Sequence, residues 1–275
     1  MFFYFNHIGC TTCDVMKISE LKIQFASDLH LEFPENQDFL EKFPIKPVGE
    51  VLILAGDIVP LVSLNKFNSF FDHLSHSFEK VFWIPGNHEY YHYDLGSKCG
   101  SFKEKIRENI WFLNNQEIIH KNYRLIFSTL WSHISPQNIL PIQQNLNDFR
   151  FIKFNGKPFT PKTFNTLYEQ KRKFIENRLQ QKNNFSSIVV THHVPTFLNY
   201  PEQYKNSRLN EAFTVELYDL ILTEQPDYWV YGHHHFNTTD FKIENCRLLT
   251  NQLGYVAYNE HRNFVLDKTI PFSAE

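Results

Sequence analysis

Short, almost wholly apolar runs recur along this chain, and each is followed directly by turn-forming or polar residues. Several lack the alternation of apolar and polar residues that a half-exposed strand shows, so we predict strands that are covered on both faces. Buried strands of this kind favour an α/β fold with helices packed on the sheets. The predicted strands are residues 22–26, 51–55, 80–84, 123–129, 187–191 and 228–231.

Stretches long enough for helices separate several of these strands. The clearest begins with Thr160 as a plausible N-cap and Pro161 in the first turn. The first half of the chain therefore reads as βαβαβ, whereas after Tyr228 short strands and polar turns predict an antiparallel meander. The predicted helices are residues 65–78, 101–109, 161–181 and 210–223, and the predicted meander strands are 236–243, 247–250 and 255–257.

No internal repeat, charge block or linker divides the chain, so we predict one domain over residues 16–275. Met16 opens a segment just before the first strand, and residues 1–15 are interpreted as an N-terminal extension outside the fold. The stretch at about 132–160 is rich in Pro, Asn, Gln and aromatic residues and is long for a simple connection. We predict that it is a lid insertion, the alternative being a packed structural excursion.

Charge and cysteine content exclude several classes of partner and compartment. The formal net charge of −3 gives no basic field that would gather nucleic acid, and every apolar run is far shorter than the roughly 18 residues of a membrane-spanning helix. The first residues lack the basic segment of a signal peptide. Four unevenly spaced cysteines are too few for a disulfide framework, so we expect a cytoplasmic protein. The oligomeric state is left open.

Five polar clusters each follow one of the predicted buried strands. Strand ends in an open α/β sheet form the crevice where ligands bind, so these clusters should converge in space. Taken alone, each cluster has a structural interpretation as a turn, a helix cap or a solvated loop. All five structural interpretations would have to hold together, so we interpret the clusters as parts of one functional site. The clusters are Asp28-Leu29-His30, Gly56-Asp57, Gly86-Asn87-His88-Glu89, Thr191-His192-His193 and Gly232-His233-His234-His235.

The residue types in these clusters indicate a metal centre. Asp, His and Asn without a nearby Cys suit divalent first-row ions and do not suit a structural thiolate site. Seven candidate ligands are too many for one ion and fit two ions that share a carboxylate. Spacing alone does not decide between His192 and His193, or between His235 and His234. The candidate ligands are Asp28, His30, Asp57, Asn87, His192, His233 and His235.

In this order, the clusters resemble the motifs of the calcineurin-like metallophosphoesterase superfamily. The resemblance implies an α/β (α+β) fold of two packed mixed β-sheets flanked by helices, a four-layer αββα arrangement. It also implies two divalent ions, which could be Mn²⁺, Fe²⁺/Fe³⁺ or Zn²⁺, and it makes Asp57 the bridging ligand and His88 the catalytic histidine. The first ion would be held by Asp28, His30, Asp57 and His235, and the second by Asp57, Asn87, His192 and His233.

The resemblance implies a phosphoesterase that hydrolyses a small-molecule phosphomonoester or phosphodiester by attack of a metal-bound hydroxide, with His88 assisting the leaving group. Asn87 is assigned to substrate binding, and so is Arg150 of the predicted lid, for which the alternative is a surface salt bridge. The sequence Gly56-Asp57-Ile58-Val59-Pro60 lacks the Asp-Arg-Gly of Ser/Thr protein phosphatases, and His88 replaces the Arg of the lipid A pyrophosphatases. The alternatives are a nuclease of the same superfamily, which the acidic balance disfavours, and a non-catalytic metal-binding scaffold.

Overall fold

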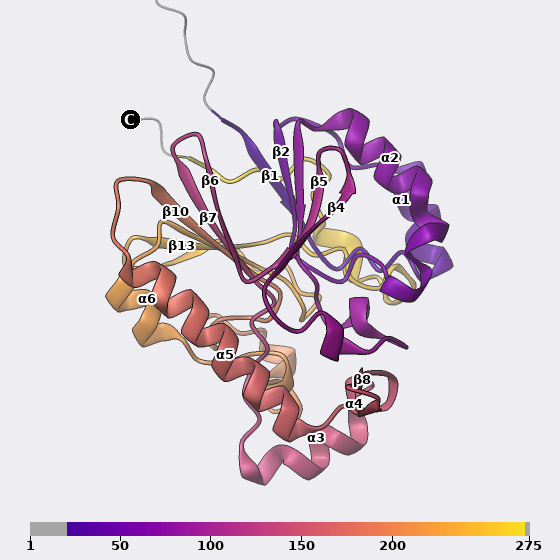
Figure 1. Ribbon diagram of the computed structural model, residues 1–275, viewed down its shortest axis with the longest axis vertical. Coiled ribbons are helices and arrows are strands. Elements are labelled where there is room, and N and C mark those ends of the chain that lie inside the picture. Colours follow the sequence, from indigo (N-terminus) through magenta and orange to yellow (C-terminus); the bar gives the residue numbers. More distant parts are fainter. Residues whose placement is uncertain (1–20, 273–275) are drawn as a thin grey trace, which may run out of the picture.

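The computed structural model describes residues 21–272, so the predicted extension at residues 1–15 lies outside the described residues. One of its two large sheets is built from the first part of the chain (Figure 1). Its strands run in the order β1-β2-β3-β5-β4, parallel except for β4 at the edge. They are β1 (Ile23–Ala26), β2 (Val51–Leu54), β3 (Lys80–Trp83), β4 (Phe102–Arg107) and β5 (Ile110–Asn114).

The other large sheet has the order β12-β13-β11-β10-β7-β6. Its four central strands are parallel, and β12 and β6 run antiparallel at the two edges. Both sheets are therefore mixed, as predicted. The strands are β6 (Gln116–His120), β7 (Tyr123–Ser128), β10 (Ser186–Thr191), β11 (Tyr228–Tyr231), β12 (Phe241–Ile243) and β13 (Cys246–Thr250).

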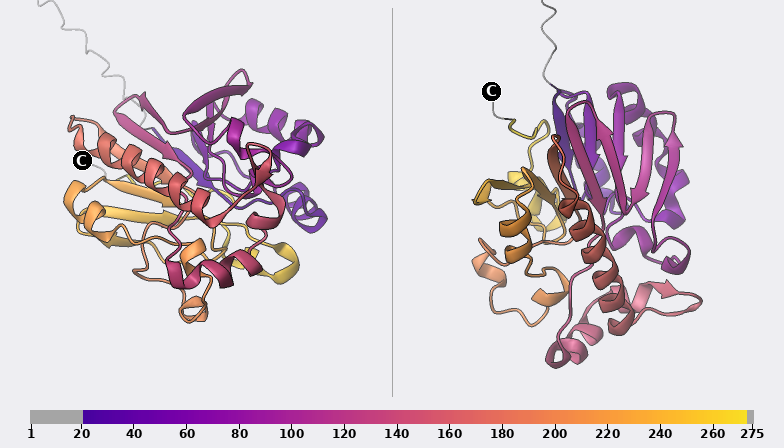
Figure 2. Two further views of the ribbon diagram at one scale, coloured as in Figure 1. Left: turned by 60° about the horizontal axis from the view of Figure 1, so that its bottom comes forward. Right: turned by 60° about the vertical axis from the view of Figure 1, so that its left-hand side comes forward.

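The two sheets pack face to face, with helices on both outer faces (Figures 1 and 2). Side chains such as Phe25, Ile53, Phe127 and Val190 fill the space between the sheets. On one outer face lie α1 (Pro34–Lys42) and α2 (Asn68–Ser77), and on the other lie α5 (Pro161–Gln180) and α6 (Tyr218–Glu224). This arrangement confirms the predicted four-layer αββα fold.

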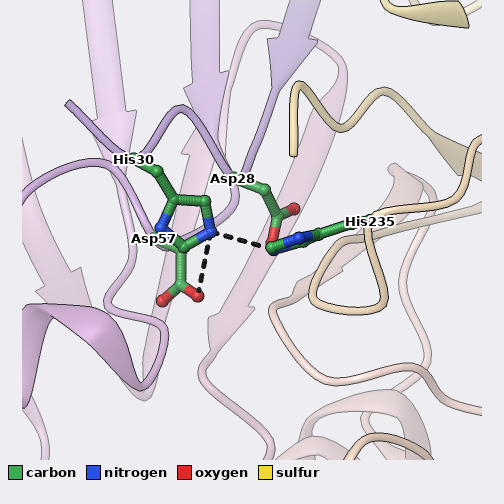
Figure 3. Close-up of side chains that lie close together, drawn as sticks. All are labelled: Asp28, His30, Asp57 and His235. Atoms are coloured by element: carbon green, nitrogen blue, oxygen red, sulfur yellow. Dashed lines mark hydrogen bonds and ion pairs between the residues drawn. The ribbon is translucent and has the colours of Figure 1, made fainter. Parts of the chain in front are cut away.

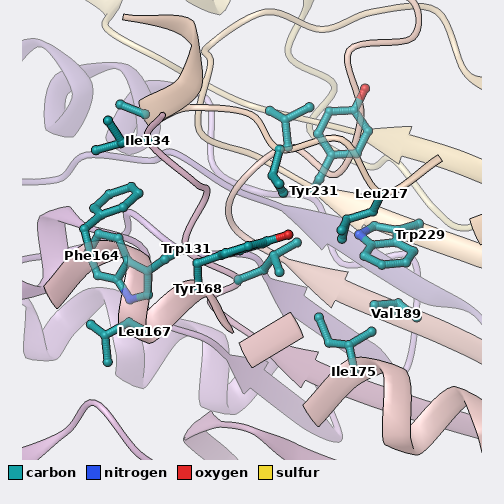
Figure 4. Close-up of a cluster of buried hydrophobic side chains, with 14 of the residues drawn as sticks. Trp131, Ile134, Phe164, Leu167, Tyr168, Ile175, Val189, Leu217, Trp229 and Tyr231 are labelled. Atoms are coloured by element: carbon teal, nitrogen blue, oxygen red, sulfur yellow. The ribbon is translucent and has the colours of Figure 1, made fainter. Parts of the chain in front are cut away.

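Local sequence explains why α5 begins where it does. The Thr160 hydroxyl accepts a hydrogen bond from the Thr163 backbone N–H at 3.2 Å, and Pro161 occupies the first turn, where no intrahelical donor is needed. Phe164 and Ile175 then recur on the face that packs against the second sheet (Figure 4). The predicted start of this helix is confirmed.

Residues 132–160 fold into two short helices, α3 (Ile139–Asn145) and α4 (Asp148–Phe151), followed by a small hairpin of β8 (Lys153–Phe154) and β9 (Lys157–Pro158). Ile142, Phe149 and Phe159 of this stretch are buried in the same cluster as Trp131 and Phe164. The stretch is therefore well packed onto the second sheet, and as shown below it also covers part of the candidate site.

Some predicted elements are wrong. Residues 101–109 were predicted as a helix but contain the edge strand β4. Its charged side chains Lys103, Glu104 and Lys105 are exposed in succession, so the pattern lacks the alternation of a typical strand. Residues 255–257 are not a strand, and β13 pairs in parallel with β11, so the predicted antiparallel meander is reduced to β12 and β13. Helix α1 and strands β5 and β6 were not predicted.

Short 3₁₀ helices complete the fold, mostly in the connections. Within residues 21–272 no helix combines the length and the apolar composition that crossing a membrane requires. The 3₁₀ helices are Leu61–Phe67, His88–Tyr90, Leu95–Ser97, Pro136–Asn138, Glu202–Tyr204, Asn210–Ala212, Val256–Tyr258 and Glu260–Asn263.

Candidate metal centre

The structure brings all seven predicted ligands together at the carboxyl ends of parallel strands. Three strands of the first sheet and two of the second supply them, so both sheets contribute to one site. We call these seven residues the floor. Asp28 and His30 follow β1, Asp57 follows β2, Asn87 follows β3, His192 follows β10, and His233 and His235 follow β11.

Four of these side chains form the first group of close donors (Figure 3). His30 Nε2 lies 2.9 Å from His235 Nε2 and 3.8 Å from Asp57 Oδ2, and His235 Nε2 lies 3.5 Å from Asp28 Oδ1. The donor atoms of all four residues lie within 4.8 Å of one another. This is the set that the resemblance assigns to the first ion.

The second group shares Asp57 with the first. His192 Nε2 lies 3.3 Å from Asp57 Oδ2, 3.0 Å from His233 Nδ1 and 3.2 Å from Asn87 Oδ1. The Asp57 oxygen that faces His192 is the same oxygen that faces His30. A carboxylate shared in this way is the arrangement that a bridging ligand requires.

Hydrogen bonds on the far side of the rings fix which nitrogens face inward. In the second group, His192 Nδ1 lies 2.9 Å from the carbonyl oxygen of Ala55, which can only accept a proton, so Nδ1 is the donor and the inward Nε2 carries a lone pair. His233 Nε2 lies 3.4 Å from the carbonyl oxygen of Ala212, which directs the lone pair of Nδ1 inward. Asn87 donates its amide N–H to Asp148 at 2.8 Å, so its oxygen points to the same place.

The first group follows the same rule with carboxylates in place of carbonyls. His30 Nδ1 lies 3.1 Å from Glu32 Oε1, and His235 Nδ1 lies 2.8 Å from Glu260 Oε2. When both rings are neutral, two lone pairs face each other at 2.9 Å, an arrangement that only a shared cation relieves. The donor set therefore fits divalent metal ions.

These groups also perturb one another's protonation. Burial lowers the pKa of His235, but hydrogen bonds and charge interactions with Asp28 and Glu260 outweigh burial and raise that pKa to about 10. Burial has the same opposing effect on His192, where the Asp57 carboxylate raises the pKa to about 9. The inward nitrogens thus take up either protons or a metal ion. Metal binding must release protons, and its apparent affinity should rise with pH.

The backbone of the floor is strained in a way that positions its side chains. Asp28, His30, Asp57 and His235 have φ of 55°, 46°, 56° and 51°, in the left-handed region that non-glycine residues rarely adopt. Such strain persists only where surrounding contacts enforce it, and it concentrates at functional sites. A Cβ at Gly86 would lie 2.2 Å from Asp57 Oδ1, so only glycine allows this close approach.

Glu89 holds two of the ligand loops together, although the sequence analysis gave it no role. Its buried carboxylate accepts hydrogen bonds from the backbone N–H groups of Asp57, Ile58 and Gly86, at 2.6–2.9 Å. Burial and the charge of Asp57 raise its pKa to about 8. Glu89 therefore fixes the loops after β2 and β3 relative to each other.

His88 lies at the edge of the floor without joining either of the two predicted ligand groups. Its Nδ1 is 2.7 Å from Glu32 Oε1, its ring stacks on Tyr91 with centroids 4.0 Å apart, and its Nε2 is 3.4 Å from the Tyr255 hydroxyl. Burial lowers the pKa of His88, but the charge of Asp57 and the hydrogen bond to Glu32 outweigh it and raise the pKa. His88 is thus held in one orientation and favours the protonated form.

The remaining candidates join neither donor group. Arg150 is exposed and donates to the Gln144 carbonyl at 2.5 Å, and it does not line the site. Two residues earlier, Asp148 is buried and accepts from both Asn87 and Tyr91. His193 packs between Trp131 and His233, and its ring nitrogens have no hydrogen-bond partner among the described residues. His234 pairs with Gln252.

A cavity of about 380 Å³ opens above the floor. Asp57, Asn87, His233 and His235 lie at its base, with His88 beside them. Its upper part is formed by residues of α3 and the segment after it, and by the segment between β10 and α6. We call these residues the rim: Asn145, Leu146, Asn147, Tyr200, Tyr204, Ser207, Leu209 and Asn210.

Comparisons with known proteins agree with this site. Residues 21–237 match the family model of the calcineurin-like phosphoesterases. An uncharacterized protein of Acanthamoeba polyphaga mimivirus, L509, is 32% identical, with 88% of this chain and 93% of that protein covered. The phosphopantetheinyl hydrolase of Mycobacterium tuberculosis shares the fold, with a TM-score of 0.65 and 16% identity over 92% of this chain and 96% of that one. A dimetal phosphatase from Danio rerio has a TM-score of 0.48 and 14% identity over 84% of this chain and 87% of that one.

The family match covers most of the chain and includes the ligand loops from Asp28 to His235. It implies divalent metal ions, and the inward lone pairs of the floor fit them. The chain therefore belongs to the calcineurin-like phosphoesterase family and is a hydrolase that acts on phosphoric esters.

Proposed function

We propose that this protein hydrolyses a small-molecule phosphomonoester or phosphodiester with two divalent ions. The observation that carries the proposal is the pair of donor groups that share Asp57. When bound, the two ions would supply Lewis acidity that lowers the pKa of water and offsets the charge of the phosphate. We assign the first ion to Asp28, His30, Asp57 and His235, and the second to Asp57, Asn87, His192 and His233.

His88 is the residue of this chain best placed to act on the leaving group. Its Nδ1 is occupied by Glu32, so its Nε2 is the nitrogen that can donate a proton. It lies beside the ligand groups and lines the cavity, where the ester oxygen would leave. Its raised pKa keeps that proton available near neutral pH. Glu32 is a positioning residue, because it sets the tautomer and orientation of His88.

Two alternatives are weaker. A nuclease needs cationic side chains along a strand of phosphates, but no described residue lining the cavity is a lysine or an arginine. A non-catalytic scaffold could dispense with ligands, yet all seven are present and converge. The candidate metals are Mn²⁺, iron and Zn²⁺. We also propose a cytoplasmic location, with which the free thiols of Cys99 and Cys246 are consistent.

The test is a set of parallel assays on 4-nitrophenyl phosphate, its diester with a second nitrophenyl group, and single-stranded DNA. Each is run with Mn²⁺, Fe²⁺ or Zn²⁺, before and after chelation, on the native chain and on Asp57→Asn. His73→Ala, which alters an exposed histidine of α2 that does not line the cavity, serves as the matched control. We expect metal-dependent hydrolysis of one small ester that His73→Ala retains. Rapid cleavage of DNA with slow turnover of both esters, or turnover that survives chelation, would contradict the proposal.

A further inference from the structure

The walls of the cavity are largely aromatic. Phe213 stacks on His233 with ring centroids 4.7 Å apart, and Tyr255 lies edge-on to His235 at 4.5 Å. Tyr200 and Tyr204, with centroids 6.4 Å apart, continue this surface outward. Such rings offer broad apolar contact to the organic part of a substrate whose phosphate lies on the floor.

Amide and hydroxyl groups are interleaved with the rings. Asn145, Asn147, Ser207 and Asn210 all line the cavity, and each can both donate and accept hydrogen bonds. Asn147 is exposed, and its side chain makes no hydrogen bond to another described residue, so its amide is available to a ligand. The Asn210 side chain already forms hydrogen bonds to the Tyr204 carbonyl and the Tyr200 hydroxyl, so it stabilises the cavity wall.

No lysine or arginine is among the described residues that line this cavity, and its histidines lie on or beside the floor. Its only carboxylates are Asp57 on the floor and Glu260, which is engaged by His235. Lys205 and Arg208 belong to the same segment as Tyr204 but do not line the cavity, and Lys205 is paired with Glu202. A second anionic group held above the floor would therefore meet no lysine or arginine, and Glu260 would repel it.

We infer that the substrate carries a single phosphoester group on an uncharged organic body that has both apolar surface and hydrogen-bonding groups. The inference rests on the proposed function, since the floor must hold the phosphate. It excludes polyphosphates, bisphosphates and nucleic acid strands, whose additional charges require lysine or arginine. The size of the cavity suits a drug-sized body.

The test compares two aryl phosphates of the same size, 4-carbamoylphenyl phosphate and 4-carboxyphenyl phosphate, which differ by one negative charge. We expect the fully metal-loaded enzyme to favour the amide in kcat/KM by about tenfold, the effect of a like charge beside Glu260. Asn147→Lys adds a cation to the cavity and should shift the ratio by about tenfold toward the carboxylate. Gln144→Lys adds the same charge to an exposed site outside the cavity and should leave the ratio unchanged.

Arg208→Gln completes the design. Arg208 stands next to the rim residue Leu209 and forms no ion pair with a described residue, so it is the cation that could reach out to an anionic substrate. We expect the ratio of the two kcat/KM values in this variant to equal that of the native enzyme. Equal or better turnover of the carboxylate by the native enzyme, or a tenfold loss of that turnover in Arg208→Gln, would overturn the inference while leaving the proposed function intact. Failure to hydrolyse either ester, with metals bound, would overturn the proposed function and the inference with it.

Discussion

The floor and the rim of the cavity are built in different ways. Six of the seven floor residues are at most 5% exposed, and the histidines of the floor are oriented by hydrogen bonds from their outward ring nitrogens to backbone carbonyls or to carboxylates. The rim comes from the connections between regular elements, and most of it is partly or fully exposed, as at Asn147 and Tyr204. We therefore expect the floor, at the strand ends, to carry the reaction, and the rim, in the connections, to select the substrate.

This difference predicts two kinds of variant. Changes in the floor should abolish metal binding or turnover, because each side chain has one productive position. Changes in the rim should alter KM or the choice of substrate and leave kcat nearly intact, because they affect binding without changing the reacting atoms.

The largest effect is expected for Asp57→Asn, since Asp57 is the ligand that both donor groups share. Loss of the bridge should remove several kcal/mol of charge stabilisation, which corresponds to at least about 10³-fold in kcat/KM. Metal content per chain, measured by elemental analysis after gel filtration, should fall as well. Full metal occupancy with normal turnover would show that Asp57 does not bridge.

His88→Ala comes next. It should keep its metals and lower kcat by about 10² to 10⁴, the usual range for a lost general acid. A nitrophenolate leaves readily without a proton, so a nitrophenyl ester should lose less activity than an alkyl phosphate. Equal losses on both esters would assign His88 to phosphate positioning, and unchanged turnover would remove it from the mechanism.

Glu32→Gln tests the support behind His88 and should reduce kcat by about 10- to 100-fold. The Glu32 carboxylate raises the pKa of His88, so its loss lowers that pKa. If protonated His88 is the acid, the fall in activity at high pH should begin at lower pH in the variant. Glu35→Gln, on the exposed first turn of α1, is the control. A profile identical to that of the native enzyme would contradict the positioning role.

Tyr204→Ala represents the rim and should give the smallest change. Loss of one aromatic contact corresponds to about a two- to tenfold rise in KM, with kcat unchanged. Tyr218→Ala, at an exposed ring outside the cavity, should change neither constant. A large fall in kcat for Tyr204→Ala would place this ring with the floor and weaken the distinction drawn above.

The same distinction explains what could be predicted from the sequence. The floor follows from residue type and from position after apolar strands, and all seven residues converge as predicted. Glu32 could have been found, because it stands two residues after His30. Glu260 and Asp148 could not, since they reach the site through tertiary packing of segments without regular periodicity.

The sequence pattern does not predict the rim or the edge strands of the sheets. Tyr200 and Tyr204 lie in a long connection whose sequence carries no regular period. The stretch at 132–160 was predicted as a lid, and it supplies both core residues such as Phe149 and rim residues such as Asn147. Strand β4 was mistaken for a helix because an exposed edge strand places charged side chains on both faces.

The most direct test of the central claim is electron paramagnetic resonance of the protein loaded with Mn²⁺ to saturation. Two ions bridged by Asp57 would lie about 3.5–4 Å apart and be magnetically coupled. We predict two Mn²⁺ per chain and a coupled spectrum, which becomes uncoupled or is lost in Asp57→Asn. Binding of a single ion by the saturated native protein, or of two ions with an uncoupled spectrum, would contradict the claim that two ions share Asp57.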